Sequence, residues 1–387
     1  MKNIKNKKTG LFPVFLFIGL FIVSFAHGFE TQGLWVVRGT LASKANIDNL
    51  INFAHENHYT DLFAQVRGRG DAYYASNFVV SPQGRNFQNF DPLAYLIIEA
   101  HRKNIKVHAW INAYLVWSRH ELPIDENHLA NKHQEWLDAN FSGNNGIDEL
   151  KTTGKNGNEG LYLSPTHPEV NQYILAVVDE IISKYDVDGI HYDYIRYHDS
   201  QYGFSRGGRK SFLLKYQVDP LSLFQNSGSY WFRMSEEESG KVQEKWNKFR
   251  ESQITDLVLI TRNMLKNKAP KVLLSAAVKP NIHVAKTRYF QNWPLWLQYD
   301  LLDFVVPMNY AKETPDFENN IFLYQSAGID FDKIYMGVAT YNQSNSSAAD
   351  KIRATRRRGF KNIVIFSYDT HLDKPQYFKK IHKAFKY

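Results

Sequence analysis

One ten-residue segment, residues 188–197 (DGIHYDYIRY), holds the side chains of this chain best suited to acid–base chemistry. Because side chains alternate along a β-strand, His191 and Asp193 would share one face of the segment while apolar residues occupy the other. A carboxylate at the carboxyl end of an inner face is the pattern of a catalytic strand in a (β/α)8 barrel. A lone strand-end aspartate is usually a solvated cap, but the closeness of His191 and Arg196 makes Asp193 the first catalytic candidate.

Polar side chains recur at the carboxyl ends of the other predicted strands, where they would bind substrate. Together with His191 and Arg196, these candidates are Arg38, Gln65, Arg67, His108, Asn112, Lys279, Asn309 and Tyr310. Any one of them could be an ordinary strand-end residue. Their recurrence at one end of successive strands predicts a single polar site, built by the loops at that end of a barrel.

The elements that would position these residues alternate along the chain. Strands are predicted at 33–39, 61–67, 105–112, 188–195, 271–278, 303–310, 333–340 and 362–368. Helices are predicted at 44–58, 91–103, 168–185, 241–267, 316–327, 347–358 and 374–385. Eight strands alternating with helices predict an α/β fold with a parallel sheet closed into a (β/α)8 TIM barrel. An open doubly wound sheet is the alternative, but no glycine-rich nucleotide turn follows the first strand.

Two predicted connections are long, residues 113–163 after the third strand and 198–240 after the fourth. Both are rich in Tyr, Trp and Phe, which argues against disorder. Tyr and Trp offer flat apolar faces with a polar tip, which suit the faces of sugar rings. Packing of the loops on the barrel explains about half of these aromatics equally well.

The N-terminus has the form of a secretory signal peptide, residues 1–28. Four lysines precede the apolar stretch 11–26, and small residues follow it. Sixteen residues are few for a membrane span, which needs about 20. Cleavage is therefore favoured over a retained anchor. We expect a secreted or periplasmic protein, with residues 29–387 as one domain and no stable membrane span after cleavage.

The composition and net charge of the chain limit the kinds of site and of binding partner that we expect. The chain has no cysteine, and therefore no disulfide, thiolate nucleophile or thiolate metal site. Removal of the four N-terminal lysines lowers the formal charge from +8 to +4. This mild basicity suits an anionic polymer without requiring one. The run 356–358 (RRR) ends a predicted helix, where cations complement the helix dipole, so nucleic acid is not an expected partner.

Five stretches together resemble the glycosyl-hydrolase-like family 10, a family of exported bacterial proteins. They are 33–38 (GLWVVR), 65–74 (QVRGRGDAYY), 108–112 (HAWIN), 188–197 and 303–310 (DFVVPMNY). The resemblance spans most of residues 33 to 370. It implies a (β/α)8 barrel that hydrolyses glycosidic bonds in a polysaccharide, with peptidoglycan glycan strands among the substrates proposed for the family.

Asp193 falls on the aspartate of the family's DGIHxDYIRY stretch. The chain departs from the family at His198, where proline is usual, and at Ser164 and Asn292, where an acidic residue is common. Those departures put in doubt any role for carboxylates at Ser164 and Asn292.

Glycoside hydrolysis usually requires two carboxyl groups, an acid that protonates the leaving oxygen and a second group that acts as nucleophile or base. His191 and Arg196 are expected to keep Asp193 ionised, which suits a nucleophile or base. The candidates for its partner, which follow the second, sixth and eighth predicted strands, are Asp71, Glu313 and Asp369. Each could instead hold a turn or be a solvated loop carboxylate. If none of these three is the partner of Asp193, we expect the partner to lie in one of the two long loops.

Two rival classes of function compete with a carboxylate glycosidase that needs no cofactor or metal. One is a metal-dependent hydrolase with His108, His191 and Asp193 as ligands, although the chain has no HExxH helix. The other is a non-catalytic glycan-binding protein that has kept the barrel and lost its acid.

Peptidoglycan glycan is a substrate that this predicted site could bind through charge. The lactyl carboxylates of its muramic acid units would give Arg38, Arg67 and Lys279 a charge to bind.

Overall fold

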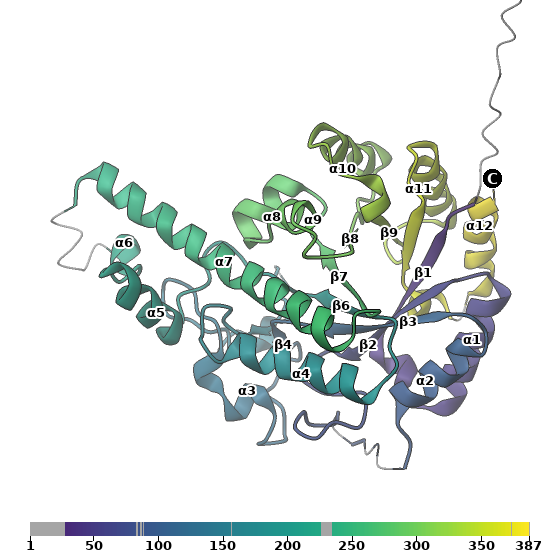
Figure 1. The fold of residues 1–387 in the computed structure, drawn as a ribbon, viewed down its shortest axis with the longest axis horizontal. Coiled ribbons are helices and arrows are strands. Elements are labelled where there is room, and N and C mark those ends of the chain that lie inside the picture. Colours follow the sequence, from purple (N-terminus) through teal and green to yellow (C-terminus); the bar gives the residue numbers. More distant parts are fainter. Residues whose placement is uncertain are drawn as a thin grey trace, which may run out of the picture.

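Eight parallel strands form the centre of the computed structural model, which describes residues 28–387 except 83, 86, 88, 156, 226–233, 373 and 387 (Figure 1). They are β1 (Thr31–Val36), β2 (Asp61–Arg67), β3 (Lys106–Asn112), β6 (Gly189–Asp193), β7 (Leu273–Val278), β8 (Phe304–Pro307), β9 (Tyr335–Ala339) and β10 (Asn362–Phe366). Each of the eight predicted strands overlaps one of them. The predicted signal peptide, except Gly28, lies outside the described residues.

The strands follow the order β8-β7-β6-β3-β2-β1-β10-β9, and parallel ladders join the neighbours. Two isolated parallel bridges, Val305–Ile334 and Met308–Gly337, connect β8 with β9 and bring the sheet round to a nearly closed barrel. The prediction of a (β/α)8 TIM barrel is confirmed.

The strands are buried on both faces because they lie between the barrel interior and a layer of helices. All seven residues of β2 and all five of β6 are buried, which is typical of parallel strands in α/β proteins. An aromatic cluster that includes Trp35, Phe63 and Trp110 fills the interior. Burial on both sides explains why these segments appear in the sequence as nearly continuous apolar runs.

The seven predicted helices are present with small shifts of their ends. They are α1 (Lys44–Glu56), α2 (Pro92–His101), α4 (Val170–Lys184), α7 (Glu236–Lys268), α10 (Thr314–Ser326), α11 (Asn345–Arg357) and α12 (Pro375–Lys386). The short helices α3 (Leu129–Lys132), α5 (Arg206–Tyr216), α6 (Ser222–Gln225), α8 (Ile282–Tyr289) and α9 (Trp293–Gln298) were not predicted. No helix in the described part of the chain combines the length and apolar character needed to cross a bilayer.

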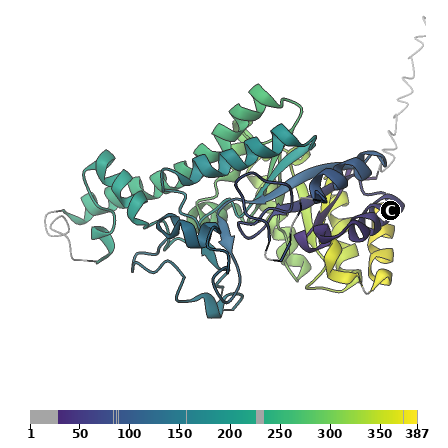
Figure 2. The ribbon, with the colours of Figure 1, turned by 90° about the horizontal axis from the view of Figure 1, so that it is seen from below.

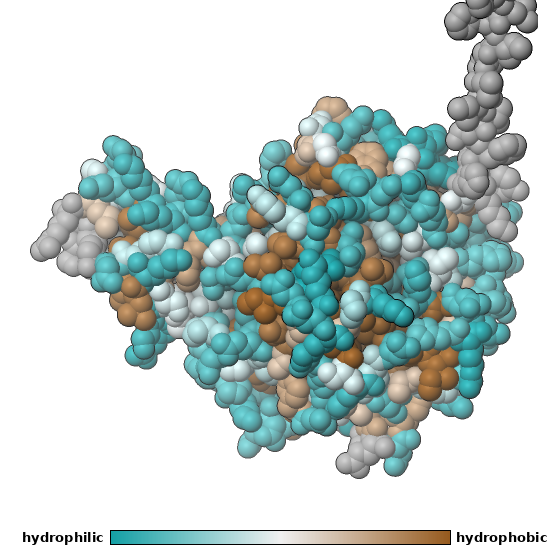
Figure 3. Space-filling view, in the orientation of Figure 1, coloured by the Kyte–Doolittle hydropathy of each residue, from teal (hydrophilic) through white to brown (hydrophobic). Residues whose placement is uncertain are grey.

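The two long loops fold in different ways. The loop after β3 is pinned by an antiparallel pair, β4 (Leu115–Trp117) and β5 (Leu161–Tyr162). The loop after β6 forms an arm of α5, α6 and the first turns of α7, which projects from the barrel in two perpendicular views (Figures 1 and 2). A recess separates this arm from the body of the molecule (Figure 3). Aromatic residues of the arm, including Phe212 and Trp246, pack into a core of their own.

Candidate active site

A cavity of about 410 Å³ opens at the carboxyl end of the barrel. Each of the eight strands, or the residues just after it, contributes to its lining. Seven of the predicted site residues line it: Arg38, Gln65, Asn112, Asp193, Arg196, Lys279 and Tyr310. Other lining residues, not singled out from the sequence, include Trp35, Ser118, Glu159, Tyr194 and Tyr341. The strand ends thus meet in one polar site with aromatic walls.

Asp193 is the last residue of β6 and is 6% exposed. Its Oδ1 accepts a hydrogen bond of 2.7 Å from the backbone N–H of Tyr194. Tyr194 has a left-handed backbone (φ 50°), which few residues other than glycine adopt and which is common at functional sites. Burial raises the pKa of the Asp193 carboxyl to about 6, although the Tyr194 hydrogen bond and then Arg196 oppose the rise. Asp193 therefore keeps its proton to a higher pH than an ordinary aspartate.

Glu159 is the second carboxyl group of the cavity, and it comes from the loop after β3. Its two oxygens lie 3.0 and 2.9 Å from Nη2 of Arg196, and the Tyr162 hydroxyl also donates to it. Burial would raise the pKa of this carboxyl, but Arg196 and then Lys279 bring it below the ordinary value. Glu159 is thus held ionised. The pKa values of the two carboxyl groups in this cavity are therefore shifted in opposite directions.

The β4–β5 pair positions Glu159. Gly160, which follows it, has φ +118°, and a Cβ placed there would lie 2.0 Å from the carbonyl oxygen of Trp117. Only glycine allows the chain to pass so close to β4 in this conformation. The sequence signal was therefore a glycine directly after an acidic residue, but the same loop holds several other acids, so the signal did not single out Glu159.

Arg196 and Lys279 provide the positive charge of the cavity. The Arg196 guanidinium is 2% exposed and lies 4.9 Å from the ring centroid of Tyr194 and 5.2 Å from that of Tyr289. The Lys279 ammonium lies 4.7 Å from the centroid of the same Tyr289 ring. Burial, followed by the charge of Arg196, lowers the pKa of Lys279 to about 8. Arg196 is committed to Glu159, whereas among the described residues Lys279 has no ion-pair partner within 4.0 Å.

A chain of hydrogen bonds links the ends of β1, β2 and β3. Arg38 donates to Oε1 of Gln65 (2.7 Å), and Gln65 donates to Oδ1 of Asn112 (3.3 Å). Asn112 in turn donates to the carbonyl oxygen of Gly68 (2.6 Å). Gly68 has no room for a side chain, because a Cβ there would lie 2.6 Å from the Arg38 guanidinium. This series of hydrogen bonds fixes Arg38 on one wall of the cavity.

Arg67, predicted to share the cavity with Arg38, does not line it. Strand alternation would place Gln65 and Arg67 on the same face, but the pairing of β2 with β3 shifts register between them. Such a bulge turns the following side chain to another direction. The buried Arg67 guanidinium instead donates to the carbonyl oxygen of Asn112 (2.5 Å) and lies 5.6 Å from the Tyr173 ring centroid on α4.

His191 and His108 lie inside the barrel and do not line the cavity. Trp35 donates to Nε2 of His191 (3.3 Å), and Nδ1 of His191 lies 2.9 Å from the Ser275 hydroxyl. Burial lowers the pKa of His191 well below its ordinary value, so His191 is neutral. The expectation that it keeps Asp193 ionised is therefore not met. His191 instead fixes Trp35 in the cavity wall.

His108 lies deeper in the barrel, where its Nε2 is 2.9 Å from Oδ1 of Asp61 at the start of β2. Within the described part of the chain, no three His, Cys, Asp or Glu side chains form a group that could hold a metal ion. The set of His108, His191 and Asp193 considered as metal ligands is therefore not assembled.

The other predicted residues lie around the rim and outside the cavity. Asn309 is buried and donates to the carbonyl oxygen of Phe317, which ties the end of β8 to α10. Glu313 is exposed at the start of α10. Asp71 accepts from the backbone N–H of Arg69 (2.9 Å). Asp369 accepts from the backbone N–H of Val37 (2.7 Å) and so holds the chain next to Arg38.

Neither Ser164 nor Asn292 lines the cavity. The lack of an acidic residue at these two positions therefore does not deprive the cavity of carboxyl groups. Asp193 and Glu159 together have the composition of a proton donor and an ionised partner.

Comparison with known proteins identifies relatives of the chain. It is 27% identical over 214 residues to glycosyl hydrolase YngK of Bacillus subtilis (strain 168), a match that covers 49% of this chain and 38% of that protein. It is 30% identical over 180 residues to glycosyl hydrolase DigH of Escherichia coli (strain K12), covering 42% of this chain and 36% of that protein. The matched stretches span well under half the length of either relative.

Solved structures share the fold at low sequence identity. The PgaB (BpsB) glycoside hydrolase domain from Bordetella bronchiseptica superposes with a TM-score of 0.67 at 14% identity, covering 92% of this chain and 98% of that one. The catalytic domain of β-amylase from Paenibacillus polymyxa superposes with a TM-score of 0.55 at 11% identity, with the same two coverages. The model of the glycosyl hydrolase-like 10 family matches residues 32–356, most of the chain. The chain therefore belongs to the glycosyl hydrolase-like 10 family.

Proposed function

We propose that the protein is a glycoside hydrolase in which Asp193 is the general acid and Glu159 is the ionised nucleophile or base. The observation that carries the proposal is the opposite shift of the two pKa values within one cavity, upward at Asp193 and downward at Glu159. Pairs of carboxyl groups separated in this way divide the acid and base roles between them. Asp193 protonates the glycosidic oxygen as the bond to the sugar breaks, and Glu159 attacks the sugar or activates water.

The substrate we propose is a polysaccharide, with peptidoglycan glycan strands as the first to assay, and the place of action is outside the cytoplasm. Support comes from membership of a glycosyl hydrolase-like family and from aromatic rings in the cavity wall. The lysine-rich start and apolar stretch of the first 28 residues support export.

Two variants test the assignment. Both variants preserve the shape of the side chain. Asp193→Asn removes the proton donor and Glu159→Gln removes the negative charge, so each should lower kcat by about 10²–10⁴-fold. Glu313→Gln, on an exposed carboxyl outside the cavity, is the matched control. Release of reducing ends from soluble peptidoglycan glycan, with and without peptide stems, measures turnover. An Asp193→Asn protein that melts no lower than the parent and still cleaves within about tenfold of it would show that Asp193 is not the acid.

The pH profile separates the two roles. Activity should fall as pH rises through about 6, because Asp193 then loses the proton that it must donate. It should also fall at a pH below the ordinary range of glutamate, where Glu159 becomes protonated. In Glu159→Gln the acidic limb of any residual activity should disappear. Glycan binding without release of reducing ends at any pH would favour the non-catalytic glycan-binding alternative.

A further inference from the structure

A second hollow of about 200 Å³ adjoins the active-site cavity, and three arginines line it. Arg69 comes from the turn after β2, Arg119 from the segment after β4, and Arg85 from the connection to α2. We call it the arginine hollow. Nε of Arg69 donates to the hydroxyl of Ser118 (2.7 Å), and Ser118 lines the active-site cavity. The Arg69–Ser118 contact thus forms a wall shared by the two sites.

The arginines of this hollow lack the ion pairs that neutralise other arginines. In the described ranges, no carboxylate oxygen lies within 4.0 Å of the guanidinium groups of Arg69, Arg85 or Arg119. Arg85 donates to a backbone carbonyl, that of Ala42 (3.0 Å). Arg119 lies 5.9 Å from the ring centroid of Trp117. The hollow therefore brings three guanidinium groups together without a direct ion pair to any of them.

Two carboxylates line the same hollow, but backbone groups already bind them. Asp71 accepts from the N–H of Arg69, and Asp125 accepts from the N–H of Asn127 (2.8 Å). The charge balance at Arg69 remains repulsive. Burial, then the charges of Arg38 and Arg119, lower the pKa of Arg69 to about 10, and the opposing effect of Asp71 is smaller than either arginine's. A bound anion would relieve this repulsion.

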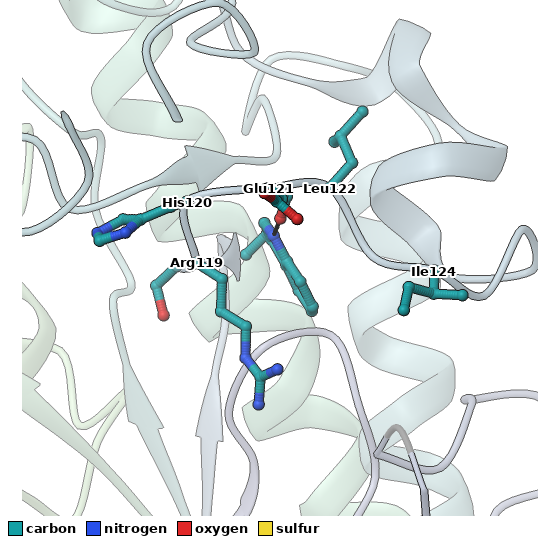
Figure 4. Close-up of a pocket in the computed structure, with 7 residues that line it drawn as sticks. Arg119, His120, Glu121, Leu122 and Ile124 are labelled. Carbon is teal, nitrogen blue, oxygen red and sulfur yellow. Dashed lines mark hydrogen bonds between the residues drawn. The ribbon is translucent and has the colours of Figure 1, made fainter. Parts of the chain in front are cut away.

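The turn that carries Arg69 is held rigidly. Residues 67 and 72 form an isolated antiparallel bridge across it, and Nε2 of His128 lies 2.7 Å from the Arg69 carbonyl oxygen. Gly70 (φ +73°) leaves no room for a Cβ, which would lie 2.9 Å from Val116. Arg119 is exposed, and in Figure 4 its side chain extends away from the segment on the side opposite to Leu122. One guanidinium is thus preorganised, and the other is free to close on a ligand.

We propose that the arginine hollow binds the carboxylate of an acidic sugar unit, in a glycan whose neighbouring unit occupies the active-site cavity. This inference rests on the proposed function, because it requires a glycan in that cavity. A carboxylate presents two oxygens in one plane, which match the planar donors of a guanidinium. The shared Arg69–Ser118 wall places the hollow beside the reacting sugar and outside the reaction itself. The site therefore selects acidic glycans over neutral ones.

Equilibrium binding to the full chain tests the site in the Asp193→Asn background, in which turnover is expected to be slow. The probes are peptide-free peptidoglycan glycan oligosaccharides, either intact or with their carboxyl groups reduced to alcohols. Oligogalacturonate supplies carboxylates from uronic acid. Arg69→Gln and Arg119→Gln are compared with Arg102→Gln, an exposed arginine paired with Glu99 on α2. Melting temperatures of all variants check folding, and Arg119→Gln, at an exposed position, gives the readout if Arg69→Gln does not fold.

We expect the background protein to bind intact glycan about tenfold more tightly than reduced glycan, since only the intact glycan offers charged acceptors to the guanidinium groups. Arg69→Gln and Arg119→Gln should remove this difference, while Arg102→Gln retains it. Tighter binding of oligogalacturonate than of the peptidoglycan glycan would assign the site to uronic acids.

Equal affinity of the background protein for intact and reduced glycan would overturn the proposal. So would equal losses of affinity for both glycans in Arg69→Gln and Arg119→Gln. A carboxylate preference without hydrolysis by the parent protein would uphold this site and reject the proposed activity. Hydrolysis without that preference would do the reverse.

Discussion

At the scale of single residues, the role proposed for Asp193 opposes the stability of the fold. Burial favours the protonated form, so the folded state binds this proton more tightly than the unfolded chain does. The stability gained from the proton is complete below the ordinary pKa of 3.8 and is lost as pH rises through about 6. At neutral pH the folded protein bears the cost of a buried charge. A proton donor at this position thus weakens the fold at neutral pH.

Asp193→Asn should therefore stabilise the protein at high pH. The amide keeps the acceptor oxygen for Tyr194 and never ionises, so at pH 8 the free energy of unfolding should rise by up to about 3 kcal/mol. At pH 3, below the ordinary pKa of 3.8, the variant and the parent should melt at nearly the same temperature. Thermal melts at these two pH values measure the effect. A difference in melting temperature that does not change with pH would contradict the raised pKa.

The alternation of side chains along strands predicted part of the site from the sequence. It was sufficient for Gln65, Asn112 and Asp193, which follow regular strands into the cavity. It was not sufficient for Arg67, because a bulge is a property of how two strands pair and leaves no mark in one strand alone. Glu159 could not be predicted, because its place depends on a contact between two ends of a long loop.

At the scale of elements, the β4–β5 pair determines whether the second carboxyl group reaches the cavity. The pair is short, only three residues of β4 and two of β5, and it relies on the close approach of Gly160 to Trp117. Closing this long loop costs conformational entropy, so the contacts between β4 and β5 must be strong enough to offset that cost. The geometry of Gly160 therefore matters more to the site than its half-buried position in a loop implies.

Gly160→Ala should displace Glu159 and lower kcat, with a loss of about 1–3 kcal/mol in stability from the strained backbone. Gly143→Ala is the matched control, since Gly143 also has a positive φ (+85°) but a Cβ there would contact nothing within 4 Å. Reducing-end assays and thermal melts of both variants separate backbone strain from displacement. Equal losses of activity in the two variants would show that the Trp117 contact does not position Glu159.

The eight strands and seven of the helices could be predicted because each has a long and regular pattern. The short α8 and α9 could not, because α8 has only eight residues and α9 six, too few for a helical period to be recognised. The projection of α5 with the start of α7 could not be predicted either, because Phe212 of α5 packs with Trp246 and Phe249 of α7 in a cluster separate from the main core.

At the scale of the whole molecule, the two ends of the domain are packed together. Phe29 is 6% exposed, and its ring lies 6.1 Å from that of Phe385 on α12, in an edge-to-face arrangement. The backbone N–H of Glu30 donates to the carbonyl oxygen of Lys361 (2.8 Å). These contacts are made by residues that directly follow the predicted signal peptide, residues 1–28.

A protein that begins at Phe29 should therefore fold as stably as the full chain, and one that begins at Thr31 should not. Loss of a buried phenylalanine side chain costs about 3–5 kcal/mol. Thermal melts of the two truncated proteins measure the difference, and mass spectrometry of exported protein should find an N-terminus close to residue 29. Equal melting temperatures would show that Phe29 does not contribute to the fold.

The seam between β8 and β9 has a consequence for the motion of the barrel. Only the two isolated bridges join these strands among the described residues, while the neighbouring pairs form ladders. Met308 and Tyr310 line the cavity on one side of the seam, and Tyr341 lines it on the other. Parting of the strands there would widen the mouth of the cavity along this seam. Amide hydrogens facing this seam should exchange with deuterium faster than those of β3 and β6, and a bound glycan that spans the seam should slow them.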